Sequence, residues 1–385
     1  MAKLFPFQRS GLKKPNHAVM ATLAACAVLG VAAMGVQLFG DPAAGAPRIR
    51  IALDGPAQAE AAPAATAPLA DVIVDPSLDA GYPGDPAAAE SAAIDPNAPI
   101  IDLSGQGGGA DRPRANPLPP APIASVFKQG PNGGLPVTGP NGATPFSVYR
   151  RPFKPDGRKP RLAVIVGGLG FNARTTQQAI NELPADVTLS FMPYAKDLQT
   201  WIDKARADGH EVILEVPMEP FDSEANDTGP QTLLAGADAR ENNSRLENLL
   251  ARGAGYFAVM NYQGGKFAAS AQASAPVIKA MKSRGLALIG AGVSGRSALG
   301  LEASRAGMIF TGVDRAVDAR QDAESIDEQL LMLEALALQN GSALGAGFAY
   351  PVTIEQIEFW AASLSQRGYQ LVPASAVLEA RAGGR

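Results

Sequence analysis

A short apolar run, Leu162-Ala163-Val164-Ile165-Val166, ends directly at Gly167-Gly168. A helical pattern follows at about residues 173 to 183, and this alternation of apolar run and helical stretch continues toward the C-terminus. The alternation is typical of repeated βα units whose strands are parallel. Strands are expected at 162–166, 187–191, 212–216, 256–259, 286–289 and 370–372, with weaker ones at 308–310 and 343–345. Helices are expected at about 173–183, 196–208, 240–251, 271–284, 297–306, 323–339 and 353–367.

Seven or eight such units in roughly 220 residues fit an α/β domain, either an irregular (β/α) barrel or an open doubly wound sheet. Both architectures make the same functional prediction. Ligands bind at the carboxyl ends of parallel strands, so the residues that directly follow each strand are the candidates for a site.

The N-terminal region has the pattern of a membrane anchor. Residues 18–39 carry no charged side chain and are long enough to cross a bilayer as one helix. Basic residues precede the span, at Lys3, Arg9, Lys13 and Lys14. Residues 1–17 are therefore expected to be a cytoplasmic tail, 18–39 a single inner-membrane helix, and the remainder periplasmic. A cleaved signal peptide is the alternative, with Ala44-Gly45-Ala46 as a weak cleavage site.

Residues 40–158 are dominated by Ala, Pro, Gly and Asp. A segment of this composition buries too little apolar surface to offset the entropy of an ordered chain. It is predicted to be a disordered linker, partly extended where proline is dense, in front of a folded domain at 159–380.

Composition excludes several classes of function. The net charge of -4 provides no basic field for a phosphate backbone, so no nucleic-acid partner is expected. Cys26, the single cysteine, lies inside the apolar span, which leaves neither a disulfide framework nor a cysteine metal site.

Three segments together resemble the divergent polysaccharide deacetylase family of bacterial envelopes. They are Leu183-Pro184 with residues 187–195, Ala207-Asp208-Gly209-His210-Glu211-Val212, and Val216-Pro217-Met218-Glu219-Pro220 with Asn226-Asp227-Thr228-Gly229-Pro230. Weaker matches extend to Arg367-Gly368-Tyr369. The resemblance implies an irregular (β/α) barrel related to metal-dependent carbohydrate N-deacetylases, and a role in carbohydrate metabolism at the cell envelope.

The chain departs from this family pattern at three strand ends. Many relatives carry paired aspartates after the first strand, where this chain has Gly167-Gly168. Many carry Gly-His-Pro-Tyr-Pro late in the domain, where it has Gly347-Phe348-Ala349-Tyr350-Pro351. An expected aspartate after the fifth strand is replaced within Gly290-Ala291-Gly292-Val293-Ser294. The departures predict a pseudoenzyme without a bound metal or other cofactor.

Histidine counting leads to the same prediction. Metal-assisted deacetylation needs a cation held by His and Asp ligands, and the chain has two histidines in all. His17 lies beside the apolar span. His210 precedes a strand and thus lies at the amino-terminal pole of the domain, where we interpret it as a buried hydrogen-bonding residue of a helix-to-strand turn.

The candidate site residues lie at the carboxyl ends of strands or after them. Glu215 and Glu219 are candidate general acids or bases, although a helix-capping or loop-stabilising role is slightly favoured for each. Candidate ligand-binding residues are Gly167, Gly168, Asp227, Asn261, Tyr262, Asp314 and Tyr350. Asn and Tyr suit the hydroxyls and faces of sugars.

A stretch at residues 168–173 matches a dinucleotide fingerprint in form, but no acidic residue ends the next strand to bind a ribose. A close-packed turn with room for a ligand is the preferred interpretation of Gly167 and Gly168.

Three functional hypotheses remain open. The first is a tethered domain that binds peptidoglycan or another envelope glycan without hydrolysing it. The second is an active hydrolase with an atypical carboxylate site. The third is a scaffolding protein of the envelope, for which a large exposed apolar patch away from the strand ends is the expected sign.

Overall fold

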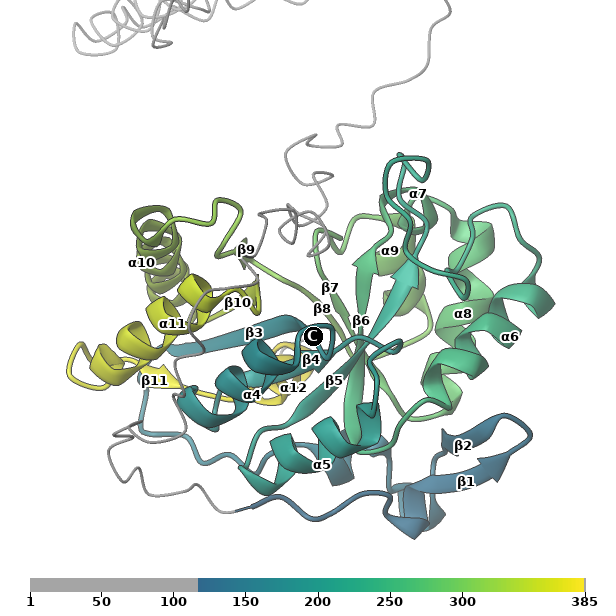
Figure 1. Ribbon diagram of the computed structural model, residues 1–385, viewed down its shortest axis with the longest axis horizontal. Helices are drawn as coiled ribbons and strands as arrows, with labels where there is room; N and C mark the ends of the chain where they lie inside the picture. Colours follow the sequence, from purple (N-terminus) through teal and green to yellow (C-terminus); the bar gives the residue numbers. More distant parts are fainter. Residues whose placement is uncertain (1–116, 384–385) are drawn as a thin grey trace, which may run out of the picture. The chain divides into compact units, whose positions relative to one another are not determined.

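The computed structural model describes residues 117–383, and within them one parallel sheet dominates (Figure 1). Its strands are β3 (Arg161–Leu169), β4 (Thr188–Phe191), β5 (Val212–Met218), β6 (Tyr256–Gln263), β7 (Ala287–Gly290), β8 (Phe310–Gly312), β9 (Arg315–Ala316), β10 (Ser342–Phe348) and β11 (Gln370–Leu371). Their order is β8-β7-β6-β5-β4-β3-β10-β9, with β11 paired to the start of β3. The predicted parallel βα architecture is confirmed.

The sheet curls into a half-barrel whose end strands, β8 and β9, are not paired with each other among the described residues. Two consecutive residues link the two sides of this opening. The N–H of Val313 donates to Gly290 O on β7, and the N–H of Asp314 donates to Leu344 O on β10. The side chain of Arg381 also lies here, with Nη2 2.5 Å from Asp314 Oδ2.

Seven helices stand where the sequence predicted them: α4 (Ala173–Glu182), α5 (Leu198–Ala207), α6 (Ala239–Leu250), α8 (Ala271–Ser283), α9 (Ala298–Arg305), α10 (Ala323–Asn340) and α11 (Pro351–Leu364). Five begin at a side chain that accepts backbone N–H groups of the first turn, namely Asn172, Asp238, Ser270, Ser297 and Asp322. Between Arg161 and Gly383, two further helices, α7 (Gly265–Ala268) and α12 (Ala374–Gly383), lie outside the predicted set.

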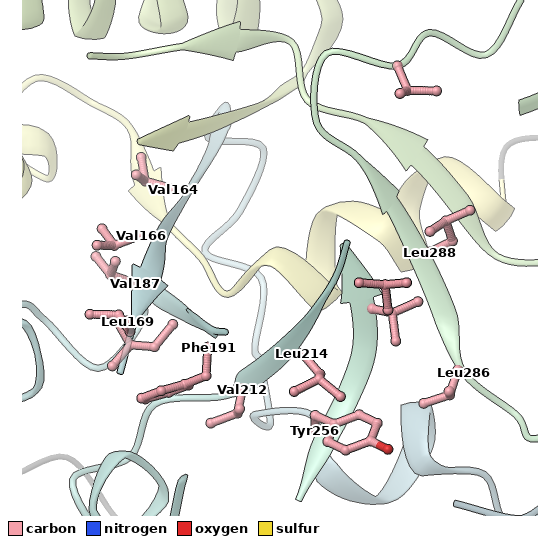
Figure 2. Packing of buried hydrophobic residues seen from close by; sticks show 14 of the residues in the cluster. Val164, Val166, Leu169, Val187, Phe191, Val212, Leu214, Tyr256, Leu286 and Leu288 are labelled. Carbon is pink, nitrogen blue, oxygen red and sulfur yellow. The ribbon is translucent and has the colours of Figure 1, made fainter. Parts of the chain in front are cut away.

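Both faces of the sheet are buried. Outward-facing side chains such as Val164, Phe191 and Leu214 (Figure 2) belong to one buried core with residues of the seven helices. Inward-facing side chains such as Ile165 and Ile213 pack against residues of α12 and of a segment before β3. Burial on both faces accounts for the continuous apolar runs of the strands.

The predicted linker is too long at its C-terminal end, since the chain is folded from Pro117 onward. This segment contains η2 (Ala124–Val126), the antiparallel pair β1 (Phe127–Gly130) and β2 (Gly133–Pro136), η3 (Pro140–Gly142) and α3 (Pro145–Tyr149). It has no core of its own, which is why its composition indicates disorder. It folds because Val126, Phe146 and Tyr149 enter the inner core of the sheet.

Arg206 at the end of α5 fixes that segment. Its guanidinium is buried and donates to three carbonyl oxygens, those of Pro119 (2.8 Å from Nη2), Tyr149 (3.0 Å) and Gly255 (3.0 Å), while it stacks 5.0 Å from the Tyr149 ring. Burial lowers the pKa of Arg206 to about 10, so the group remains charged at neutral pH.

The predicted tail and transmembrane helix, and the linker up to residue 116, lie outside the described residues. Between Pro117 and Gly383, no helix combines the length and the apolar composition that a bilayer crossing requires.

His210 has the structural role predicted for it. The ring is fully buried just before β5, with Nδ1 2.8 Å from Val187 O and Nε2 3.2 Å from Ile180 O. Burial lowers the pKa of His210 below its ordinary value, and a neutral ring carries one N–H, so one of the two carbonyls receives a hydrogen bond.

Replacing His210 with Ala should leave a buried carbonyl group without its donor and reduce the free energy of unfolding by about 1 to 3 kcal/mol. Thermal melting of the full-length chain measures the change. His210→Asn, which keeps an N–H near the Nδ1 position, should lose clearly less. Equal losses in the two variants would show that packing, and not the hydrogen bond, is what His210 supplies.

Candidate functional site

A carboxyl group lies in the inner face of the sheet near the carboxyl ends of the strands. Glu215 lies on β5 between the outward-facing Leu214 and Val216, so its side chain enters the interior. Its Oε1 accepts a hydrogen bond from Gly168 N at 2.7 Å, across the intervening strand β4.

Burial raises the pKa of Glu215 to about 7, against the lowering effect of the Gly168 N–H. The buried Ser190 Oγ of β4 lies close enough to stabilise the carboxylate electrostatically, but it makes no hydrogen bond of normal geometry. A group of this pKa exchanges its proton near neutral pH, which a general acid or base requires.

The space beside Gly167 and Gly168 is occupied. A Cβ on Gly167 would lie 2.8 Å from Glu215 Oε1, and a Cβ on Gly168 would lie 2.6 Å from the Phe348 ring. The turn into α4 is also closed, because Asn172 Oδ1 accepts the N–H groups of Arg174 and Thr175 at the helix N-terminus. The interpretation of a close-packed turn is therefore confirmed, whereas the predicted room for a ligand beside the two glycines is not found.

Three aromatic rings gather at the same strand ends. Tyr262 lies near the end of β6, and its ring meets the Phe348 ring edge-on with centroids 6.4 Å apart. The centroid of the Tyr350 ring lies 5.9 Å from that of Phe348. All three side chains are partly exposed. We call Tyr262, Phe348 and Tyr350 the aromatic rim.

Asp318 accepts a hydrogen bond from the backbone of the aromatic rim and was not among the predicted site residues. Its Oδ2 accepts from Phe348 N (2.6 Å) and Thr353 Oγ1 (3.0 Å), while Oδ1 is buried without a hydrogen bond to any described residue. Burial raises the pKa of Asp318 to about 6. Burial also raises the pKa of Tyr350 to about 12, with further contributions from Asp318 and Tyr262.

Glu219 and Asn261 lie at the strand ends, and their hydrogen bonds hold loops in place. Glu219 accepts a hydrogen bond from Ala235 N and pairs with Lys266 Nζ, both at 2.7 Å. Desolvation raises the pKa of Glu219, but the hydrogen bonds from Lys266 and Ala235 outweigh this effect. The pKa is therefore lowered from its ordinary value. Asn261 is buried and exchanges hydrogen bonds with the backbone of Ala291, thereby joining the end of β6 to the loop after β7. A ligand contact by either remains a prediction.

The two remaining candidates, Asp227 and Asp314, do not lie with the other predicted site residues. Asp227 is exposed and accepts Gly229 N at 2.8 Å, a local turn contact. Asp314 accepts Leu344 N and binds Arg381 in the opening between β8 and β9. Gly167, Gly168, Glu215, Tyr262 and Tyr350 are thus the predicted residues that come together.

The residues present do not fit the metal that the family resemblance implies. Glycine stands at 167 and 168, and the Phe348 ring fills the position of the family histidine. Within the part of the chain described by the structure, no three His, Cys, Asp or Glu side chains form a group able to hold a metal ion.

A sequence model of the divergent polysaccharide deacetylase family matches residues 164–378. The chain belongs to this family. A crystal structure of an uncharacterized protein from Agrobacterium tumefaciens C58 is 38% identical, with a TM-score of 0.62, and covers 64% of this chain and 99% of its own.

Two other relatives are more distant. An uncharacterized protein of Haemophilus influenzae is 21% identical over 201 residues, which is 51% of this chain and 70% of that protein. The catalytic domain of a peptidoglycan N-acetylglucosamine deacetylase from Eubacterium rectale is 11% identical with a TM-score of 0.38 and covers 58% of this chain and 91% of its own, a likeness too low to support an activity here.

Replacing Glu215 with Gln should change how stability depends on pH. The folded-state pKa of about 7 exceeds the ordinary 4.5, so the folded protein binds more protons than the unfolded one between these values. This contribution is fully present below pH 4.5 and is lost as the pH rises to 7. The unfolding free energy of Glu215→Gln relative to the natural chain should therefore increase over this interval, by on the order of 3 kcal/mol, and level off above it.

Urea unfolding of the full-length chain at several pH values measures this difference. Glu224→Gln, a change in an exposed loop, is the matched control and should shift nothing. A Glu215→Gln difference that is flat from pH 4.5 to 7 would contradict the raised pKa.

Proposed function

We propose that the domain binds an envelope glycan such as peptidoglycan on the aromatic rim and does not hydrolyse it. The observation that carries the proposal is the contact of the partly exposed Tyr262, Phe348 and Tyr350 rings at the carboxyl ends of the strands. In α/β folds this is the edge at which ligands bind.

The chemistry of the rim suits a sugar. A tyrosine presents an apolar ring face, against which the C–H groups of a pyranose pack, together with a hydroxyl that exchanges hydrogen bonds with sugar hydroxyls. Burial raises the pKa of Tyr350 to about 12, so this hydroxyl is protonated at neutral pH.

The absence of hydrolysis follows from the side chains at the strand ends. Metal-assisted deacetylation needs ligands that polarise the acetyl carbonyl through a cation, and here glycine and phenylalanine stand at the places where relatives carry aspartate and histidine. We therefore propose a pseudoenzyme that has kept the site as a recognition surface.

Membrane attachment completes the proposal. The uncharged span at 18–39, preceded by basic residues, supports an inner-membrane anchor with the domain in the periplasm. In that arrangement the domain is held close to the peptidoglycan layer, which raises its effective concentration at the glycan.

A second candidate is a hydrolase that uses Glu215 as general acid or base. The pKa of about 7 is the specific observation in its favour. Release of acetate from acetylated peptidoglycan fragments by the natural chain, and its loss in Glu215→Gln, would favour this candidate over binding alone.

The scaffolding alternative also has one observation in its favour. α10 and α11 expose large apolar side chains away from the aromatic rim, including Leu331, Leu338 and Phe359. Single exposed apolar residues are common on soluble proteins, so we rank this alternative below glycan binding.

Replacing Tyr350 with Ala should weaken binding to purified peptidoglycan sacculi roughly fivefold, the equivalent of about 1 kcal/mol for one aromatic contact. Co-sedimentation of the full-length chain with sacculi measures the affinity. Tyr350→Phe, which keeps the ring but removes the hydroxyl, should show an intermediate loss.

Phe359→Ala is the matched control, because it removes a ring that is 63% exposed on α11. Its binding should equal that of the natural chain. Failure of the natural chain to sediment with sacculi would overturn the proposal, and equal losses in Phe359→Ala and Tyr350→Ala would move the binding surface away from the rim.

A reporter enzyme that is active only outside the cytoplasm should be active when fused after Arg385. The expectation rests on the basic residues ahead of the span, which favour a cytoplasmic N-terminus. Enzyme activity and N-terminal sequencing of the mature fusion are the measurements. An inactive but stable fusion contradicts the topology, and a mature chain that begins near Ala46 shows a cleaved signal peptide.

A further inference from the structure

The carboxylate of Glu215 lies where a side chain on residue 167 would have to go. An ideal Cβ built on Gly167 comes within 2.8 Å of Glu215 Oε1, closer than real Cβ atoms approach, while the next neighbour, Met260 Cε, is at 3.6 Å. Gly167 does not have a positive φ, so its backbone is open to any residue. By these distances, Glu215 is the one close obstacle to a Cβ on residue 167.

Glu215 has little freedom to move aside. A carboxyl group at the end of a flexible side chain normally yields to a new methyl group at small cost. Here the group is fully buried, and its Oε1 holds the Gly168 N–H at 2.7 Å. A shift of Glu215 therefore breaks this hydrogen bond inside the protein, where neither partner finds water.

Gly168 is blocked in a different way. A Cβ at this position meets Phe348 Cδ1 at 2.6 Å, and the backbone φ of +69° lies in the left-handed region that favours glycine. Two independent constraints thus act at residue 168, one from a ring on β10 and one from the backbone itself.

We infer that Glu215 of β5 is coupled to Gly167 of β3 by packing. The carboxyl group reaches the inner space beside residue 167 from two strands away and occupies the place of a side chain there. A residue larger than glycine at 167 therefore requires a simultaneous change at 215. This inference stands on geometry and does not depend on glycan binding.

A double-mutant cycle tests the coupling. Gly167→Ala in the natural full-length chain should lower the melting temperature by about 3 to 10 °C, the effect of overpacking a closed interior. In the Glu215→Ala background the same Gly167→Ala step should cost about 1 °C or less, because the obstacle is gone. Tryptophan fluorescence follows the melt through the buried Trp360.

Two matched substitutions show whether the effect belongs to this pair. Gly345→Ala on β10 also meets a close neighbour, Leu333 Cδ2 at 2.8 Å, and its cost should be the same with and without Glu215. Gly168→Ala should remain costly even when Phe348 is replaced with Ala, because the positive φ persists. If only the Gly167→Ala step becomes less costly when its neighbour is removed, Glu215 is the specific cause of that cost.

Each outcome of the double-mutant cycle either supports or overturns the coupling between Gly167 and Glu215. If Gly167→Ala fails to fold and the Gly167→Ala, Glu215→Ala double variant folds, the inference is supported. An equal cost of Gly167→Ala in both backgrounds, no cost in either, or a double variant that fails to fold where Glu215→Ala folds, each overturns it.

Discussion

A carboxylate at the start of β5 joins the parts of the domain that the sheet alone would leave separate. Glu211 is fully buried and accepts four hydrogen bonds, from Arg151 N, Thr188 Oγ1, Ser375 N and Ser375 Oγ. These donors belong to the chain before β3, to β4 and to the first turn of α12. Because a buried carboxylate without donors costs several kcal/mol, the four elements are held in one arrangement, and α12 is fixed over the inner face of the half-barrel.

Glu215, four residues further on, faces the same side of β5 but has one well-formed hydrogen bond, from Gly168 N. Burial raises the pKa of both glutamates above the ordinary value, and that of Glu215 to about 7. The four hydrogen bonds of Glu211 tie separate elements together, which suits a structural group. Glu215 has fewer partners and a pKa near neutral pH.

Aromatic side chains gather at the carboxyl ends of the strands, the edge at which ligands bind in α/β folds. Phe348 and Tyr262 meet edge-on, Tyr350 packs beside them, and Asp318 lies beneath with one unpaired buried oxygen. This is a surface with apolar ring faces and hydroxyl donors, supported by a carboxyl group whose desolvation is partly uncompensated. Ring faces and hydroxyl groups of this kind support the proposed binding of a sugar. Among the described residues, no three His, Cys, Asp or Glu side chains gather here to hold a metal ion.

The sequence by itself determined the local structure. Apolar runs such as 162–166 and capping residues such as Asn172 and Asp322 depend on neighbours within a few residues, and so strands, helices and the turn role of His210 were predictable. Tertiary structure alone decided the rest, because the contacts join residues far apart in the chain. The segment from Pro117 folds through Arg206 and the inner core, α12 is held by Glu211, and Asp318 lies under Phe348 through β9 and β10 pairing. The sequence predicted a close-packed turn with room for a ligand at Gly167 and Gly168, and side chains from β5 and β10 fill that room.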